Sequence, residues 1–134
     1  MDEAVRGARL VAADIEQSTG FPTEVGSTYD AEWRRFGKQT GRPEPEGWVN
    51  ITVREVGTSA ALDPTEPGSA TAAEFAMELV RILQDDIQIH LREPWPRDPA
   101  GGGRALEPTD AGWRSRVDGG YLVPYGQLGR FSSR

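Results

Sequence analysis

The clearest pattern in the sequence is an amphipathic stretch from residue 71 to residue 92, which predicts a helix of about six turns. It opens with Thr71-Ala72-Ala73-Glu74, where the threonine hydroxyl and the glutamate carboxylate can each accept a backbone N–H of the first turn. Pro94 and Pro96 prevent the helix from continuing. We expect this helix to organise the core through its apolar half, which consists of Ala72, Phe75, Ala76, Leu79, Val80, Ile82, Leu83, Ile87 and Leu91.

A second helical pattern covers residues 2–18 and stops before Gly20. Its apolar residues fall within one arc of the helical wheel, and they are Ala4, Val5, Ala8, Val11, Ala12 and Ile15. Because most of them are small, we expect this helix to pack closely beside the longer one and to bury little surface.

Alternation of apolar and polar residues predicts strands at residues 48–56, 113–117 and 121–125. The last two flank Asp118-Gly119-Gly120, a turn sequence that suits a hairpin. We therefore predict an α+β fold, in which these strands form one small antiparallel sheet with the long helix across one face and the N-terminal helix (2–18) beside it.

Three other segments carry weaker signals. Residues 57–68 contain Pro-based turn sequences, and residues 97–112 contain three successive glycines, so we expect turns in the first segment and a flexible loop in the second. Residues 21–42 leave two alternatives open. Either Asp30 caps a short helix that runs through Phe36, or residues 24–29 form a strand.

Composition indicates one folded domain with a thin core. Leu, Ile, Val and Phe account for 26 of the 134 residues, about 19%, which lies just below the ~20% level associated with disorder. The low net charge of −6 and the seven Trp and Tyr residues favour folding nonetheless. We expect a single domain over residues 1–129, followed by a tail at 130–134, and a structure that gains stability from a partner.

Charge and cysteine content exclude several classes of function. With 21 acidic and 15 basic residues, the chain lacks the basic surplus that general nucleic-acid binding requires. The absence of cysteine removes disulfides and thiolate chemistry. No apolar run is long enough to span a membrane and no signal-peptide pattern is present, so we expect a cytoplasmic protein. Fourteen arginines against one lysine indicate a GC-rich, actinobacterial genome.

From about Gly47 to Gly129 the chain resembles a group of short actinobacterial proteins of unknown function. The matching segments are Leu83-Gln84-Asp85-Asp86-Ile87-Gln88, Glu93-Pro94-Trp95-Pro96 and Gly126-Gln127-Leu128-Gly129. The resemblance implies a strand, a helix that ends before Pro-Trp-Pro, a segment rich in Cys, His and Pro, and a further strand. In this chain residues 97–103 contain neither Cys nor His, so the resemblance implies architecture and no metal site.

Asp86 and His90 are the most unusual residues of the long helix. They are four residues apart, so they lie on one helix face, and both fall within the apolar half of the wheel. A buried carboxylate beside an imidazole can relay a proton or join a metal site. The alternative is structural: Asp86 accepts backbone N–H groups from a neighbouring segment, and His90 lies near the helix C-terminus, where the helix dipole favours its charged form.

Two places are candidates for contact with a protein partner. Trp33, Arg34 and Arg35 belong to a local basic and aromatic segment, which suits an acidic protein surface better than nucleic acid, given the overall negative charge. Trp95 lies between two prolines. It is either a binding anchor or a hydrophobic plug at the helix end.

These observations favour a non-catalytic protein-interaction or assembly module. Such a module is a homo-oligomer, a component of a larger particle, or an immunity-type protein that binds and neutralises a partner. The alternative is a small enzyme or ligand-binding domain centred on Asp86 and His90, with Tyr121 or Tyr125 as a further polar group. The sequence predicts no metal and no cofactor for either function.

Overall fold

The two predicted helices are present in the computed structural model, which describes residues 2–27, 49–62, 71–98, 103–117 and 122–131. Helix α1 spans Asp2–Thr19, and helix α3 spans Ala72–Leu91. At the start of α3, Thr71 Oγ1 accepts the Glu74 N–H, and Glu74 Oε1 accepts the Thr71 N–H, which confirms the expected capping arrangement. The helix ends where Arg92 adopts a left-handed backbone conformation, just before Pro94.

The first sheet contains three antiparallel strands in the order β1-β2-β3: β1 (Thr23–Ser27), β2 (Val49–Val53) and β3 (Thr58–Leu62). Along β2, Val49, Ile51 and Val53 are fully buried while the intervening residues are half-buried, so one face of the sheet belongs to the core. A tight turn at residues 54–57 joins β2 to β3. Gly57 closes this turn with a positive φ of 76°.

The second sheet is also antiparallel, in the order β4-β5-β6: β4 (Glu107–Thr109), β5 (Gly112–Arg114) and β6 (Leu122–Val123). The pairing of β5 with β6 confirms the predicted hairpin, whose turn at 118–120 lies outside the described residues. A short helix, α4 (Leu128–Phe131), follows β6 and packs on α1.

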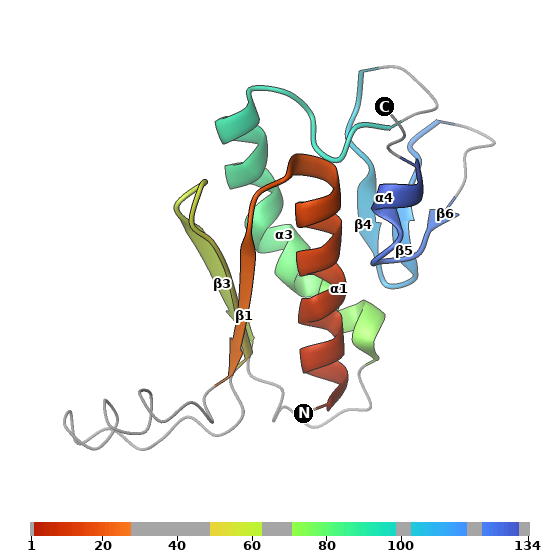
Figure 1. Ribbon diagram of the computed structural model, residues 1–134. Helices are drawn as coiled ribbons and strands as arrows, with labels where there is room; N and C mark the ends of the chain where they lie inside the picture. Colours follow the sequence, from red (N-terminus) through yellow and green to blue (C-terminus); the bar gives the residue numbers. More distant parts are fainter. Residues whose placement is uncertain (1, 28–48, 63–70, 99–102, 118–121, 132–134) are drawn as a thin grey trace.

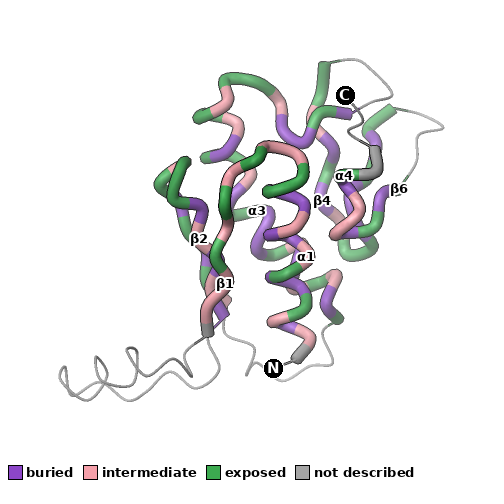
Figure 2. The backbone as a smooth tube through the Cα atoms, in the orientation of Figure 1, coloured by how far each residue is buried: buried purple, intermediate pink, exposed green. Residues whose placement is uncertain are grey.

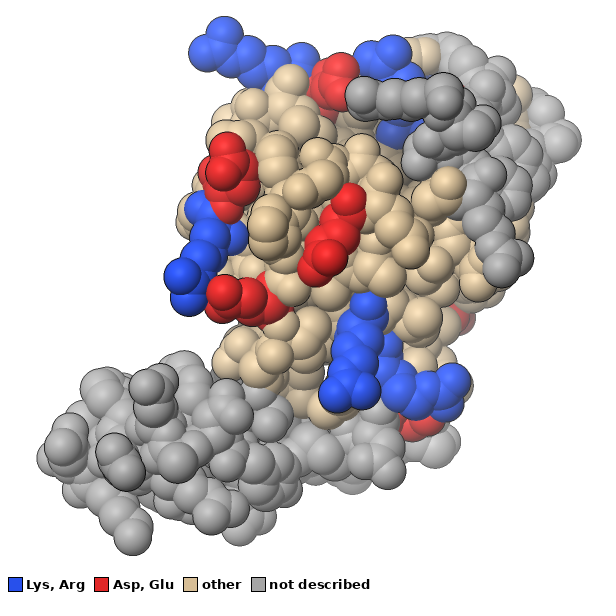
Figure 3. All heavy atoms as spheres, viewed as in Figure 1, with Lys and Arg blue, Asp and Glu red and all other residues tan. Residues whose placement is uncertain are grey.

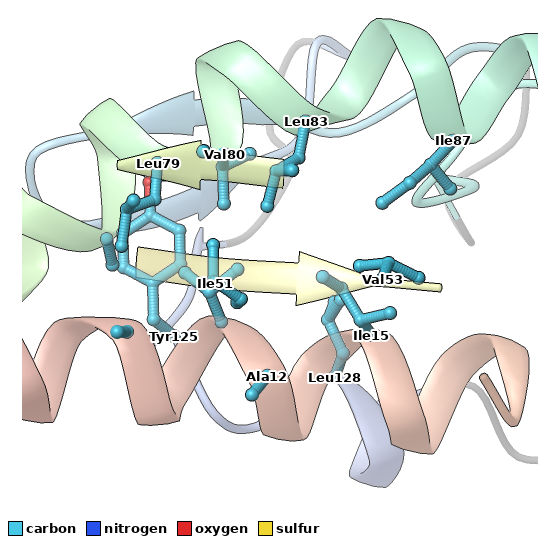
Figure 4. Close-up of a cluster of buried hydrophobic side chains, with 14 of the residues drawn as sticks. Ala12, Ile15, Ile51, Val53, Leu79, Val80, Leu83, Ile87, Tyr125 and Leu128 are labelled. Atoms are coloured by element: carbon cyan, nitrogen blue, oxygen red, sulfur yellow. The ribbon is translucent and has the colours of Figure 1, made fainter. Parts of the chain in front are cut away.

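Helices α1 and α3 lie between the two sheets (Figure 1). Buried residues therefore recur along both helices, as Figure 2 shows. On one side, Leu79, Leu83 and Ile87 of α3 point toward the valines and the isoleucine of β2 (Figure 4). On the other side, the helices meet a cluster of larger side chains from the second sheet and its flanking segments, namely Trp95, Leu106, Trp113, Tyr125 and Leu128.

The structure confirms the α+β class and corrects the arrangement of strands. The predicted strands 48–56 and 113–117 contribute to different sheets. Strand β3 pairs with β2 in the first sheet, and strand β4 pairs with β5 in the second. Residues 57–68, expected as turns, contain β3, and residues 97–112, expected as a loop, contain β4 and an isolated bridge between Arg97 and Ala105. Within 21–42, β1 supports the strand alternative, and the helix alternative from Asp30 to Phe36 lies outside the described residues.

The C-terminal boundary also differs from the expectation. A tail was expected to begin at residue 130, but α4 extends through Phe131. The first N–H groups of this short helix are accepted by side chains of α1, because Asp14 Oδ1 accepts the Leu128 N–H and Gln17 Oε1 accepts the Gly129 N–H.

The two long helices approach most closely at Gly7 of α1. A Cβ atom at this position would lie 2.5 Å from the backbone oxygen of Ala72 and 3.0 Å from the backbone nitrogen of Ala76. Glu3, one turn earlier on α1, accepts the Ala72 N–H at 2.9 Å through Oε2. The absence of a side chain at Gly7 thus allows α1 to lie directly against the first turns of α3.

We expect Gly7→Ala to lower the free energy of unfolding by about 1–2 kcal/mol, because the helices must separate to admit the methyl group. This is the net change, because the steric cost exceeds the roughly 1 kcal/mol that alanine gains over glycine inside a helix. Urea denaturation followed by circular dichroism measures the change. Arg9→Ala, at an exposed position of the same helix, should stay within about 0.5 kcal/mol of the wild type. A more stable Gly7→Ala variant would contradict the close crossing.

Candidate functional site

Asp86 and His90 lie on the same face of α3, as predicted, but both side chains are exposed. The expectation that they are buried is wrong. Asp86 falls at the edge of the packed arc of α3, and His90 continues the packed line of Leu83 and Ile87 but lies in the last turn of the helix. Each residue contacts a neighbouring segment instead of the other. Asp86 Oδ2 accepts the Thr58 hydroxyl at 2.6 Å, and the His90 ring meets Phe21 edge-on at 5.5 Å. No hydrogen bond joins the carboxylate to the imidazole among the described residues.

The proposed third member of that site, Tyr125, lies elsewhere in the fold. Its hydroxyl donates to the Thr109 carbonyl oxygen at 2.6 Å, and its ring packs against Trp113. Burial raises the pKa of Tyr125 above its ordinary range, so the phenol stays protonated at neutral pH. Tyr121 lies outside the described residues. Among the described residues, the structure therefore does not bring Tyr125 to Asp86 and His90.

The strongest polar cluster in the described structure surrounds Asp14, a residue that the sequence patterns did not single out. Its side chain is fully buried. One oxygen, Oδ2, accepts the Trp113 indole N–H and the Gly126 backbone N–H, both at 2.8 Å, while Oδ1 accepts the Leu128 N–H at 3.0 Å. Burial raises the pKa of Asp14, and the three hydrogen bonds oppose part of that rise. Asp14 thus fastens α1 to the second sheet and to α4.

Trp95 is enclosed rather than presented to solvent. It is 4% exposed, its indole N–H donates to Ser18 Oγ at 2.9 Å, and its ring packs edge-on against Trp113. This is the geometry of the plug alternative, and in this conformation the ring offers almost no surface to a partner. Trp113 is fully buried as well.

Two glutamines of α3 hold the segment that carries Trp95. Gln84 Nε2 donates to the Trp95 and Leu106 carbonyl oxygens at 3.0 and 3.1 Å, and Gln88 Oε1 accepts the Trp95 N–H at 3.1 Å. We expect Gln84→Ala to cost about 1–3 kcal/mol of stability, because two partly buried carbonyls lose their donor. Gln88→Ala, which removes a single bond, should cost about 0.5–1.5 kcal/mol. Urea denaturation of both variants checks the order, and a larger loss for Gln88→Ala would contradict it.

The outer face of α3 carries exposed aliphatic side chains. Ile82 is 47% exposed and Ile89 is 74% exposed. They are seven residues apart, so they lie one above the other along the helix. The wheel placed Ile82 in the apolar half, but that residue faces solvent because Leu79, Leu83 and Ile87 already fill the contact with the sheet.

Acidic side chains flank these two isoleucines. Glu78 and Asp85 are exposed and lie on the same side of the helix, one turn before each isoleucine. Neither forms an ion pair within the part of the chain that the structure describes. We call the four residues Glu78, Ile82, Asp85 and Ile89 the α3 ridge.

Other described surfaces offer fewer candidate binding features than the α3 ridge. A hollow of about 440 Å³ is lined by Gln17, Gly126, Gln127 and Gly129, and none of these described residues carries a charge. On the face seen in Figure 3, acidic and basic side chains are interspersed, so the described residues form no continuous basic patch there.

The remaining candidates are the basic and aromatic segment, a metal site and a membrane span. Trp33, Arg34 and Arg35 lie in the segment that the structure leaves out. Across residues 2–27, 49–62, 71–98, 103–117 and 122–131, no three His, Asp or Glu side chains come together as a metal site requires. None of the helices in these ranges is long and apolar enough to cross a membrane.

Comparison of the chain with protein-family models, with curated proteins and with solved structures found no match. Its function is therefore inferred from its own geometry.

Proposed function

We propose that this chain is a non-catalytic protein-interaction module that binds its partner through the α3 ridge. The observation that carries the proposal is the pair Ile82 and Ile89, exposed on one line of a helix whose opposite side is fully packed. Single exposed aliphatic residues are ordinary on protein surfaces. Two on one ridge of a rigid, capped helix form the start of a helix-binding surface.

Elsewhere in the fold, the buried polar side chains have a structural role, which supports a function without catalysis. Asp14, Tyr125 and Trp95 each hold one part of the fold to another through hydrogen bonds. In the described part of the chain, no buried side-chain nitrogen or oxygen lacks a hydrogen-bond partner. These groups are engaged in holding the fold, so the ridge is the surface best suited to a function.

The apolar area of the α3 ridge limits the binding free energy that it can contribute. Full burial of an isoleucine side chain contributes about 1.5–3 kcal/mol. Given the exposed fractions of Ile82 and Ile89, covering both contributes about 2–4 kcal/mol. A micromolar complex requires about 8 kcal/mol. The two isoleucines are therefore the centre of a larger interface, to which the neighbouring acidic side chains also contribute.

Site-specific photo-crosslinking tests this proposal. A photo-reactive phenylalanine derivative replaces Ile89 in the full chain, expressed in the organism that encodes it. The matched control places the same group at Leu122, which is 46% exposed on β6 of the other sheet. We expect a discrete protein adduct from position 89 and none from position 122. The same adducts at both positions, or no adduct at position 89, would refute the proposal.

A further inference from the structure

The α3 ridge alternates acidic and aliphatic residues with the spacing of a two-helix seam. Glu78, Ile82, Asp85 and Ile89 follow one another at intervals of four, three and four residues. This is the spacing at which side chains of one helix face a second helix packed alongside it. Most such seams are apolar at every position, whereas this one carries a carboxylate at every second position.

The two carboxylates need a partner of opposite charge once the ridge is covered. Burying an ionised carboxylate without a partner is costly, and it is tolerated when a cation pairs with it. Arg81 is the nearest arginine in sequence, within one turn of both acids, but no ion pair forms among these described residues. Within the described ranges no cation is paired with either acid, so the bound molecule is the source of cations that we consider.

The α3 ridge of a second copy does not supply them. If two ridges pack antiparallel with Ile82 facing Ile89 of the other copy, Asp85 lies opposite the Asp85–Asp86 pair of the other copy. If they pack parallel, Asp85 lies opposite Asp85 and Glu78 opposite Glu78. Both arrangements place like charges in a seam, which disfavours association. Asp86 adds a further negative charge at the edge of the ridge, although it also accepts the Thr58 hydroxyl.

We infer that the α3 ridge binds a basic amphipathic helix of another protein, with aliphatic residues over Ile82 and Ile89 and lysine or arginine opposite Glu78 and Asp85. This inference rests on the proposed function and specifies the chemistry of the partner. Pairing of the acids with cations supplies selectivity against acidic helices, while the isoleucines supply the apolar contact.

Two synthetic peptides of about 21 residues, or three heptads, test the inference with the full chain. Both carry isoleucine at alternate seam positions, and the remaining seam positions carry lysine in one peptide and glutamate in the other. Titration is followed by backbone amide NMR shifts and by the helical signal in circular dichroism. We expect the lysine peptide to become helical on binding and to shift amides around residues 78–89. The glutamate peptide should not bind.

Variants of the chain separate the charge effect from the apolar effect. Ile82→Ser with Ile89→Ser should abolish binding of the lysine peptide. Glu78→Gln with Asp85→Asn should weaken it about five- to tenfold, as should a rise in salt from about 50 to about 500 mM. The matched control is Glu107→Gln with Asp110→Asn, which removes two exposed acids near the second sheet and should leave binding unchanged.

Equal binding of both peptides, or equal weakening by the control pair, would overturn the inference. Amide shifts outside α3 on titration with the lysine peptide would also overturn the inference. These results are distinguishable from failure of the proposed function: an adduct from position 89 with another protein, without binding of the lysine peptide, would leave the interface in place and refute only the basic helix. A crosslink between two copies of the chain would also refute the basic helix.

Discussion

Replacement of Asp14 by alanine should lower the free energy of unfolding by about 3–5 kcal/mol, because two buried N–H groups and one part-buried N–H group lose their acceptor together. The donors are the indole of Trp113 in β5 and the backbone of Gly126 and Leu128 in the segment that follows β6. Small domains are stable by only about 5–15 kcal/mol. The variant should therefore be close to unfolding at room temperature.

Urea denaturation followed by tryptophan fluorescence and circular dichroism measures this loss. With an m-value of about 1–3 kcal/mol per molar urea, the midpoint should fall by roughly 2 M. Asp85→Ala is the matched control, since it removes an exposed carboxylate that has no ion pair in the described structure, and it should change stability by less than about 0.5 kcal/mol. A loss below about 1 kcal/mol for Asp14→Ala would show that the buried donors find other acceptors.

The pH dependence of Asp14 has a definite sign. Its pKa is raised above the ordinary value of 3.8 in the folded chain, with burial as the main cause. The folded state therefore holds this proton more tightly than the unfolded state, so the group favours folding at low pH. That contribution is lost as pH rises through the raised pKa. The stability of the wild type minus that of Asp14→Asn should decrease over this pH range and then stay constant. An increase would mean that the hydrogen bonds outweigh burial.

Trp113→Ala should cost about 3–5 kcal/mol, the usual loss for a large aromatic residue removed from a packed interior. The ring is fully buried and meets Trp95 at 5.5 Å and Tyr125 at 5.4 Å, both edge-on. Trp113→Phe keeps an aromatic ring and loses the indole N–H that Asp14 accepts. It should therefore cost less, about 1–3 kcal/mol. Thermal and urea unfolding check both values, and equal losses would contradict the role of the ring contacts.

The two sites should be coupled, because Trp113 and Asp14 share a hydrogen bond. In a double-mutant cycle, Asp14→Ala combined with Trp113→Phe should cost less than the two single changes added together, by about 0.5–3 kcal/mol. The same cycle between Asp14 and the exposed Ile82 should show no coupling. Additive losses for the first pair would indicate that the indole N–H and the carboxylate act independently.

The helices and the α+β class could be predicted from the sequence because their signals are local. The Thr71 and Glu74 cap and the following prolines mark α3 without reference to the rest of the chain. The sheets depend on weaker signals. Strand β3 is built from Thr58, Ser59 and small residues, so its alternation carries little hydrophobic contrast. Strand β4 contains Pro108, which is tolerated only because β4 is an edge strand.

The functional residues were harder to predict because a helical wheel assumes one buried face. Helix α1 is covered by a sheet on each side, so Asp14 lies inside the protein although it falls outside the arc of Ala8, Val11 and Ile15. Ile89 was not included in the apolar half of the wheel, and only the fold shows that Ile82 is exposed on the same line of α3. Gln84 and Gln88 of α3 each form a hydrogen bond with the backbone of Trp95. That contact could be recognised only once the fold was known.

The hydrogen bonds of Asp14 to Gly126 and Leu128 join positions 112 and 114 residues apart in the sequence. During synthesis, the first helix leaves the ribosome long before the segments that enclose it. Until the last strands have emerged, the Asp14 carboxylate and the small apolar residues of α1 remain exposed to solvent or bound to a chaperone. Folding of this unit should therefore be completed only after Leu128 has left the ribosome, and a ribosome stalled before residue 126 should display a nascent chain that proteases cut readily.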